Sequence, residues 1–436
     1  MKDLNVASRK TAPFQSDLIG CMILICAYAP GVFQIGEIRM LTIDKIFHAS
    51  VVLKNIVRAT NIVHTEGITE DCSLFLKPEN LQKTGSFKLR GSGYKIAMLS
   101  EEEKARGVIA CSAGNHAQGV ALAATKSGVK SLICLPDSAP ISKIEATKKY
   151  GAQVCLVEGV YDDAYNRALE LKEERGYTFV HPFDDEDVIA GQGTIGLEIL
   201  EQLPEVEQIV VPIGGGGLIS GVAYAVKHLK PECRVVGVQA VGAPSMYLSL
   251  RAGEPSELKI VATIADGIAV KRPGDLTFAL CREYVDEVVT VTEDEIASAI
   301  LALMEEQKTV AEGAGAASVA ACMFGKVELK GRKTVCLVSG GNVDVTTLSR
   351  IITKGLSKAG RLVELTTKVE DKPGSLLRML QVVADSGANI ISVSHSREDK
   401  ESDVRACIVT MVLETRDSRH AEALQLELSS RGYLMR

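Results

Sequence analysis

Short apolar runs and helical patterns alternate through the middle of the chain. The apolar runs lie at residues 108–111, 131–136, 153–157, 208–213 and 234–239. Apolar residues recur at helical spacing in the intervening segments 116–126, 141–150, 161–175, 194–203 and 218–229. Strands that alternate with helices of this length predict an α/β fold with a mainly parallel sheet covered on both faces. Ligands of such folds bind beyond the carboxyl ends of the strands.

The pattern continues on both sides and changes near residue 361. Thr42 and Asp44 can cap a helix that runs to about residue 56, and residues 72–77 and 334–338 have the pattern of buried strands. The last part predicts a ferredoxin-like order: a strand at 362–369, a turn at 372–374, a helix at 375–386, strands at 390–394 and 405–413, a helix at 418–431 and a final strand. We therefore expect two folded domains, at residues 40–357 and 361–436.

Residues 1–39 differ from the rest of the chain. Their apolar run at 18–32 is too short to span a bilayer. A signal peptide with Lys2, Arg9 and Lys10 as its basic start is one interpretation. We prefer the hypothesis that the natural start is Met40, because residues 36–40 can be encoded by a purine-rich ribosome-binding site followed by ATG. Residues 1–39 would then be an extension that is not native.

Charge and composition narrow the class of partner. The chain has 55 acidic and 49 basic residues, a net charge of -6, and no basic run that could follow a phosphate backbone. Aromatic residues make up only 4% and tryptophan is absent, so the chain has few side chains on which the bases of a single-stranded nucleic acid could stack. We expect a small-molecule substrate and neither a nucleic acid nor a membrane as partner.

The cysteines indicate a reducing compartment. The chain has 11 of them, an odd number, and no Cys-x-x-Cys pair. Several lie in apolar runs, where a reduced thiol behaves as a small hydrophobic group. This usage predicts a cytoplasmic protein with neither a disulfide framework nor a zinc site.

The central candidate for catalysis is Lys88. It lies in the sequence Gln-Lys-Thr-Gly-Ser-Phe-Lys-Leu-Arg-Gly at residues 82–91, between two glycines. Next to Phe87 and Leu89 its amine can be partly desolvated, which lowers the pKa and makes the free amine available as nucleophile and base. A solvated surface lysine is the alternative, because most lysines of any chain serve that role.

Two loops follow predicted strands and can bind anions. Ser112, Gly114, Asn115 and His116 lie where the strand at 108–111 meets a helix, a place suited to a substrate carboxylate. Helix capping is the alternative role for Asn115 and His116. The second loop has four successive glycines before a helix that begins near Leu218, and their amides can surround one phosphate; these glycines are Gly214, Gly215, Gly216 and Gly217. A merely flexible loop is the alternative there.

Ser339 ends a predicted strand and precedes Gly340, Gly341 and Asn342. Its hydroxyl can be aimed at the ring nitrogen of a bound pyridine, although elsewhere it would be an ordinary turn serine.

In order and spacing, these four motifs resemble those of the fold-type II pyridoxal-phosphate enzymes, over residues 41–357. Within that group the chain is most similar to the threonine dehydratases (threonine ammonia-lyases) of the catabolic kind. The resemblance implies a fold like that of the tryptophan synthase β subunit, with two open α/β subdomains. It also implies pyridoxal 5'-phosphate as cofactor.

The resemblance assigns a role to each motif. Lys88 would hold the cofactor covalently and, once free, remove the substrate's Cα proton, while Phe87 would pack beside the ring. Asn115 would hold the 3'-oxygen, the loop from Gly214 to Leu218 the phosphate, and Ser339 the pyridine nitrogen. Gln239 departs from several relatives, which carry an acidic residue of a divalent-cation site there, so we assign no metal ligand.

Residues 371–376 and 387–390, Asp-Lys-Pro-Gly-Ser-Leu and Gly-Ala-Asn-Ile, resemble the ACT regulatory domain. The resemblance implies an amino-acid effector bound at a subunit interface near Lys372, Pro373, Gly374 and Asn389. It also implies a homodimer or a homotetramer. Isoleucine or valine is the effector we expect, in keeping with a place in isoleucine biosynthesis.

The expected reaction is dehydration and deamination of L-threonine to 2-oxobutanoate and ammonia, with L-serine as a secondary substrate. Serine racemase and β-replacement enzymes are alternatives with the same cofactor. A non-catalytic amino-acid sensor is an alternative from another class. Lys88, the glycine loop and Ser339 argue against the sensor.

Overall fold

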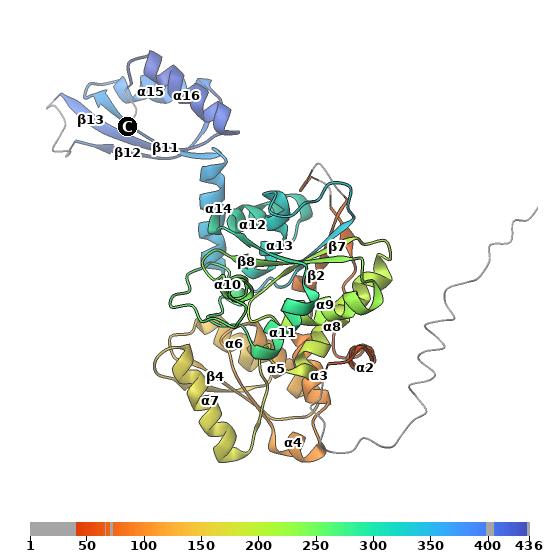
Figure 1. Cartoon of the computed structure of the whole chain (residues 1–436). Helices are drawn as coiled ribbons and strands as arrows, with labels where there is room; N and C mark the ends of the chain where they lie inside the picture. Colours follow the sequence, from red (N-terminus) through yellow and green to blue (C-terminus); the bar gives the residue numbers. More distant parts are fainter. Residues whose placement is uncertain (1–40, 66, 70–72, 398–404, 434–436) are drawn as a thin grey trace, which may run out of the picture. The chain divides into compact units, whose positions relative to one another are not determined.

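The computed structural model describes residues 41–65, 67–69, 73–397 and 405–433 (Figure 1). The expectations for residues 1–39, the start at Met40 and the final strand after residue 433 concern parts outside these ranges. Among the described residues, no helix is both long and apolar enough to cross a membrane.

Ten strands of the N-terminal part form two sheets, where the apolar pattern alone indicated one. The larger sheet has the order β1-β2-β10-β7-β8-β9 and is parallel except for the pairing of β1 with β2. The smaller sheet is parallel throughout and has the order β5-β4-β3-β6. The split is invisible in the sequence because strand and helix alternate in the same way in both sheets. The strands of the larger sheet are β1 (Val63–His64), β2 (Leu74–Pro78), β7 (Gln208–Pro212), β8 (Arg234–Ala240), β9 (Glu287–Val291) and β10 (Thr334–Val338). Those of the smaller sheet are β3 (Val108–Cys111), β4 (Ser131–Pro136), β5 (Gln153–Val157) and β6 (Thr178–Phe179).

Helices surround both sheets. They are α2 (Ile43–Leu53), α3 (Lys88–Ala97), α4 (Glu101–Arg106), α5 (Asn115–Lys126), α6 (Ile141–Lys149), α7 (Tyr161–Arg175), α8 (Glu186–Gln202), α9 (Gly217–Leu229), α10 (Ser245–Ala252), α11 (Asp275–Tyr284), α12 (Glu293–Gln307), α13 (Gly313–Met323) and α14 (Val345–Lys358). Two short 3-10 turns at Glu79–Leu81 and Asp266–Ile268 complete this part.

Helix α8 begins earlier than predicted, at Glu186, where Asp185 accepts hydrogen bonds from two backbone amides of the first turn. Its first half contains Gly191 and Gly193, which have low helix propensity and weaken the sequence signal. The structure explains their presence, because a Cβ at Gly193 would lie 2.9 Å from the carbonyl oxygen of Gly221 in α9. Small residues therefore let α8 and α9 pack closely.

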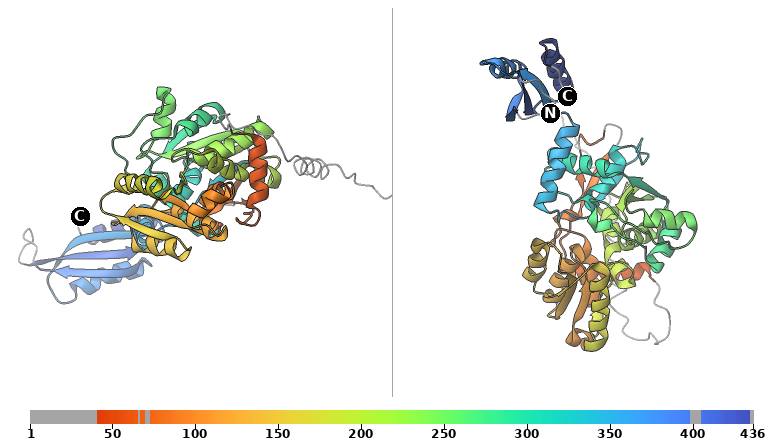
Figure 2. Two further views of the ribbon diagram at one scale, coloured as in Figure 1. Left: turned by 90° about the horizontal axis from the view of Figure 1, so that it is seen from below. Right: turned by 90° about the vertical axis from the view of Figure 1, so that its left-hand side faces the viewer.

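The C-terminal part has the predicted βαββα order. Its strands β11 (Leu362–Glu370), β12 (Asn389–Ser396) and β13 (Ala406–Glu414) form an antiparallel sheet of order β11-β13-β12. Helices α15 (Ser375–Asp385) and α16 (Ser418–Ser430) cover one face of that sheet (Figure 1; Figure 2). Leu365, Val409 and Met411 from the sheet pack with Val383 and Leu424 from the helices in a separate hydrophobic core.

Candidate active site

Lys88 is the first residue of α3 and follows a tight turn. Gly85 has a φ of 71°, and a Cβ there would lie 2.4 Å from Oδ1 of Asn342, so only glycine fits. The backbone amide of Phe87 donates a hydrogen bond of 3.1 Å to the carbonyl of Ser339. The lysine turn and the loop after β10, predicted from separate motifs, are thus in direct contact.

The Lys88 amine lies in a partly apolar setting. Nζ donates a hydrogen bond of 2.8 Å to the carbonyl oxygen of Pro182 and lies 5.2 Å from the centre of the Phe87 ring. Burial lowers the pKa of Lys88 to about 8, against the opposing charge of Glu312. About a tenth of the Lys88 side chains therefore carry the free amine at pH 7, compared with well under one in a thousand for a lysine with a pKa of 10.5.

Asn115 is the first residue of α5, and both the nitrogen and the oxygen of its side-chain amide are hydrogen-bonded. Nδ2 donates to Oε1 of Glu312 at 2.6 Å, and Oδ1 accepts from Nδ2 of Asn342 at 2.8 Å. Nδ2 of Asn342 also donates to the carbonyl of Thr84 at 2.7 Å. These bonds orient the amide and leave the second hydrogen of the Asn115 Nδ2 for a ligand.

Glu312 was missing from the predicted site although it contacts Asn115 directly. It precedes α13 and is buried. Burial, together with the charge of Asp266, raises the pKa of Glu312 to about 7, so at pH 7 the protonated and the charged carboxyl are present in about equal amounts. A lone glutamate between small residues carries no spacing signal by which sequence reasoning could have found it.

The other members of the predicted carboxylate loop have different roles. His116 is buried and its Nε2 lies 2.8 Å from the carbonyl of Val180, and burial lowers its pKa to about 3. It is a neutral ring that ties α5 to the segment before α8. Ser112 Oγ accepts from the amide of Gly114 at 3.1 Å, and a Cβ at Gly114 would meet no atom within 4 Å. Open space at Gly114 is what a substrate would need.

The four-glycine loop is packed too closely against neighbouring residues to accept side chains. A Cβ at Gly214, Gly215, Gly216 or Gly217 would lie 3.1, 2.4, 2.7 or 2.7 Å from its nearest neighbour. Gly216 also has a φ of 103°. The backbone amides of the first three glycines donate to no residue in the described part of the chain. Since α9 begins at Gly217, these amides and the helix dipole favour an anion here.

A segment that was not predicted joins the lysine to the glycine loop. After the Lys88 partner Pro182 comes Phe183, whose ring lies 2.4 Å from the position of a Cβ at Gly215. Asp184 then accepts from the amide of Thr277 at 3.0 Å, and the Thr277 hydroxyl donates to the carbonyl of Gly215 at 2.6 Å. The signal in the sequence is a His-Pro-Phe-Asp-Asp loop between β6 and α8.

Comparison with known proteins gives the family. The model of the pyridoxal-phosphate dependent enzymes matches residues 53–341, and that of the ACT domain matches residues 363–428. The chain belongs to the pyridoxal-phosphate dependent enzymes. Its L-threonine ammonia-lyase relative from Thermotoga maritima is 52% identical over 91% of this chain and 99% of the relative. The catabolic L-threonine dehydratase of Escherichia coli K12 is 45% identical over 71% of this chain and 95% of the relative.

Solved structures agree with this fold. Threonine deaminase isoform 2 from Solanum lycopersicum has a TM-score of 0.67 at 38% identity, covering 74% of this chain and 98% of that one. Maize serine racemase has a TM-score of 0.69 at 36% identity, covering 73% of this chain and 99% of that one. The fold-type II catalytic domain and the C-terminal ACT domain expected from the sequence are confirmed.

The residues present fit the family's cofactor. The free amides of the glycine loop suit a phosphate, and the oriented amide of Asn115 suits a ring oxygen. Ser86 Oγ is buried without a partner among the described residues, beside the loop that carries Ser339. Ser339 itself is buried at the end of β10. Lys88 would hold the cofactor from α3.

Arg90 is a buried residue that anchors the helix carrying Lys88. It was also missing from the predicted site. It is fully buried, and its guanidinium is shared by the carboxylates of Glu79 and Glu198 at 2.6 to 2.9 Å. Its Nη1 also donates to the hydroxyl of Thr194 at 3.2 Å. These bonds anchor the first turn of α3, two residues after Lys88, to α8.

Gln239, the position at which the chain departs from the expected family pattern, uses its side-chain amide internally. Nε2 donates to the carbonyl of Ile213 at 3.2 Å, and Oε1 accepts from the amide of Tyr247 at 2.8 Å. The side chain thus fixes the strand end before the glycine loop.

The predicted effector residues do not come together within one chain. Gly374, with a φ of 85°, precedes α15, next to Lys372 and Pro373. Asn389 is opposite Glu414 on β13, which is also opposite Leu362 at the start of β11. Asn389 therefore lies at the opposite end of the sheet from Lys372 and Gly374, about 25 Å away from them along the strands. A single effector could contact both only if two chains contribute.

Proposed function

We propose that the protein converts L-threonine to 2-oxobutanoate and ammonia, and L-serine to its oxo acid less efficiently. The observation that carries this proposal is the Lys88 amine of lowered pKa, joined through Pro182 and Phe183 to a glycine loop with free amides. The L-threonine ammonia-lyase of Thermotoga maritima, similar over nearly its whole length, supports the choice of substrate.

Lys88 acts as the general base. When bound, pyridoxal phosphate supplies an electron sink for the negative charge left on the substrate Cα. In its uncharged form, which the lowered pKa makes accessible near neutral pH, the Lys88 amine accepts the Cα proton, a role worth about 100- to 10,000-fold in rate. The Pro182 carbonyl fixes the direction of the amine.

Other groups position the reactants. The free amides of Gly214, Gly215 and Gly216 would hold the cofactor phosphate, and the Asn115 amide, fixed by Glu312, would hold the ring oxygen. The open space at Gly114 accepts the substrate carboxylate near the start of α5. The Ser339 hydroxyl would face the pyridine nitrogen and, being neutral, would not stabilise its protonated form.

Serine racemisation is the second candidate, because maize serine racemase has a TM-score of 0.69 with this structure. Incubation with L-threonine and with L-serine, followed by assays for oxo acid, ammonia and D-serine, separates the two. We expect 2-oxobutanoate and ammonia in equal amounts from threonine. D-serine as the main product would contradict the lyase proposal, and a colourless, inactive protein would favour an amino-acid sensor.

We propose further that the chain comprises a catalytic domain at residues 40–357 and a regulatory domain at 361–436, assembled as a homodimer or a homotetramer. The ACT match at residues 363–428 supports an amino-acid effector. β12 is an exposed edge strand with Ile391 57% exposed, a surface on which a second copy can pair. Cys111, Cys134 and Cys281 are free thiols, which supports a cytoplasmic location.

The test of regulation uses the full chain and a version that ends at Lys358. Each is titrated with threonine, with and without isoleucine or valine. We expect a shift of about 5- to 150-fold in apparent affinity in the full chain only. An equal response after truncation would place the effector in the catalytic domain, and no response in either protein would also contradict the proposal.

A further inference from the structure

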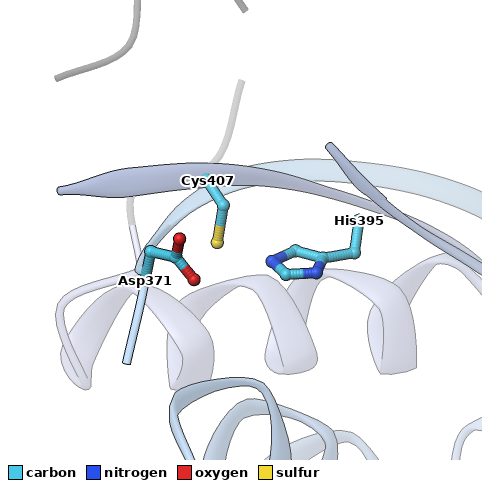
Figure 3. Close-up of side chains that lie close together, drawn as sticks. All are labelled: Asp371, His395 and Cys407. Atoms are coloured by element: carbon cyan, nitrogen blue, oxygen red, sulfur yellow. The ribbon is translucent and has the colours of Figure 1, made fainter. Parts of the chain in front are cut away.

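Three side chains of the ACT domain converge at one end of its sheet without a role in the proposed catalysis. They are Asp371, His395 and Cys407 (Figure 3). The carboxylate, imidazole and thiol come from different segments, and their ligand atoms all lie within 4.8 Å of one another. A carboxylate, an imidazole and a thiolate together are a ligand set for zinc and similar divalent transition metals.

The register of the sheet explains why these residues meet. Cys407 is opposite Val369 on β11, and Asp371 follows two residues later on the same side of that chain. His395 is opposite Val409 on β13, two residues from Cys407. All three side chains therefore project from the helix-covered face, at the end where α15 has only begun.

The three side chains line a pocket. A cavity of about 210 Å³ is lined by all three side chains together with Pro373, Leu376 and Arg397, among others. The Cys407 thiol is buried at its inner end, whereas Asp371 and His395 lie at the surface. A metal ion can therefore reach the thiol from solvent, and water can fill a fourth position.

We propose that Asp371, His395 and Cys407 form a binding site for Zn²⁺, with water as the fourth ligand. Ligand atoms of a tetrahedral zinc ion lie about 3.5 Å apart, so small side-chain rotations close the present separations. On binding, the Cys407 thiol gives up its proton to solvent and its hydrogen bond to the carbonyl of Val369.

Arg397 is the competitor of the metal at this site. Its Nε and Nη2 donate to the two carboxylate oxygens of Asp371 at 2.7 and 3.0 Å. The guanidinium competes with zinc for the lone pairs of these oxygens, and its positive charge opposes binding of the ion. Occupation of the site is thus coupled to the turn at Asp371 that precedes Lys372 and Gly374, the region we assign to the effector.

The sequence analysis predicted no zinc site because the chain has no Cys-x-x-Cys pair. The three proposed ligands are 24 and 12 residues apart, spacings that match no short zinc motif. Only the strand pairing brings them together. This site is independent of the pyridoxal phosphate site, so its failure would not affect the proposed lyase activity.

The test is a titration of the full-length, cofactor-loaded, metal-free protein with Zn²⁺ by calorimetry and with Co²⁺ by absorbance. We expect one ion per chain and a thiolate-to-cobalt charge-transfer band. Cys407→Ser should abolish the band, and His395→Ala should weaken Zn²⁺ binding at least tenfold. His395 is exposed, so its substitution should leave the thermal transition unchanged.

Three further variants sharpen the test. Arg397→Gln should tighten Zn²⁺ binding several-fold, because it frees the Asp371 carboxylate. His64→Ala and Cys155→Ser, outside the pocket, should bind as the parent does. Binding that is unchanged by His395→Ala, a cobalt band that persists in Cys407→Ser, or the absence of stoichiometric binding would overturn the proposal.

Discussion

Lys88 and Pro182, 94 residues apart in the chain, are joined by a hydrogen bond of 2.8 Å from Nζ to the carbonyl oxygen. The next residue, Phe183, lies against Gly215 and Gly217 of the glycine loop. One short segment therefore sets both the direction of the lysine amine and the shape of the proposed phosphate cradle.

The setting of Lys88 predicts an unusual pH dependence of its reactivity. Because burial lowers its pKa to about 8, the free amine should increase as pH rises through 8 and not through 10.5. Cofactor-free protein is treated with a small acylating reagent across this range, and modification of Lys88 is followed by mass spectrometry. A midpoint near 10 would show that the amine is solvated like a surface lysine.

The glycine loop should not accept a side chain. In Gly216→Ala, the new Cβ would lie 2.7 Å from Cβ of Thr277, so the loop must move and its amides lose their common direction. We expect at least a tenfold weaker affinity for pyridoxal phosphate, measured by fluorescence titration of the cofactor-free protein.

Gly253→Ala is the matched control for this change. Gly253 also has a positive φ, 84°, but a Cβ there would meet nothing within 4 Å. Both variants carry the backbone penalty of about 1 kcal/mol for an L-residue in this region. An equal loss of cofactor affinity in the two variants would mean that strain, and not the cradle, causes the effect.

Glu312 should make the stability of the cofactor-free protein depend on pH. Its pKa rises from 4.5 in the unfolded chain to about 7 in the folded one, so the folded state binds more protons between these values. The free energy of unfolding should therefore fall as pH rises from 4.5 to 7, by about 3 kcal/mol relative to Glu312→Gln. Urea unfolding of both proteins at several pH values tests this, and parallel curves would contradict it.

The buried Arg90 should be far more important for stability than a surface arginine. Arg90→Met leaves the carboxylates of Glu79 and Glu198 without their shared cation, so we expect a loss of about 3 to 5 kcal/mol in unfolding free energy. Arg332→Met breaks an exposed pair with Glu328 and should cost about 1 kcal/mol or less. Similar urea midpoints for the two variants would refute the assigned role of Arg90.

Much of the fold was predictable because it rests on local patterns. The bounds predicted for β3, β4 and β5 are those of the structure, since these runs are apolar and end at turns. Strand β9 was not predicted, because it lies at the sheet edge, starts with Glu287 and is only partly buried. The predicted α8 was too short at its start, because two glycines in its first half have low helix propensity. The structure uses them for close packing.

The motifs of the site were predictable, but their connections were not. Glycine loops and the lysine turn have local signals, whereas the contacts of Glu312 with Asn115 and of Pro182 with Lys88 join residues 197 and 94 positions apart. No local sequence pattern predicts contacts between residues so far apart in the chain. For the same reason the position of Asn389, at the far end of the ACT sheet, follows only from strand register.

The most direct test of the account compares the parent protein with Lys88→Ala in the conversion of L-threonine to 2-oxobutanoate. The lysine supplies both the covalent anchor and the proton transfer, so the account predicts a coloured, active parent and a loss of at least 100-fold in turnover in the variant. The matched control Lys83→Ala, five residues earlier in the same turn, should stay active. More than a few per cent of activity in Lys88→Ala, or no oxo acid from the parent, would contradict the account.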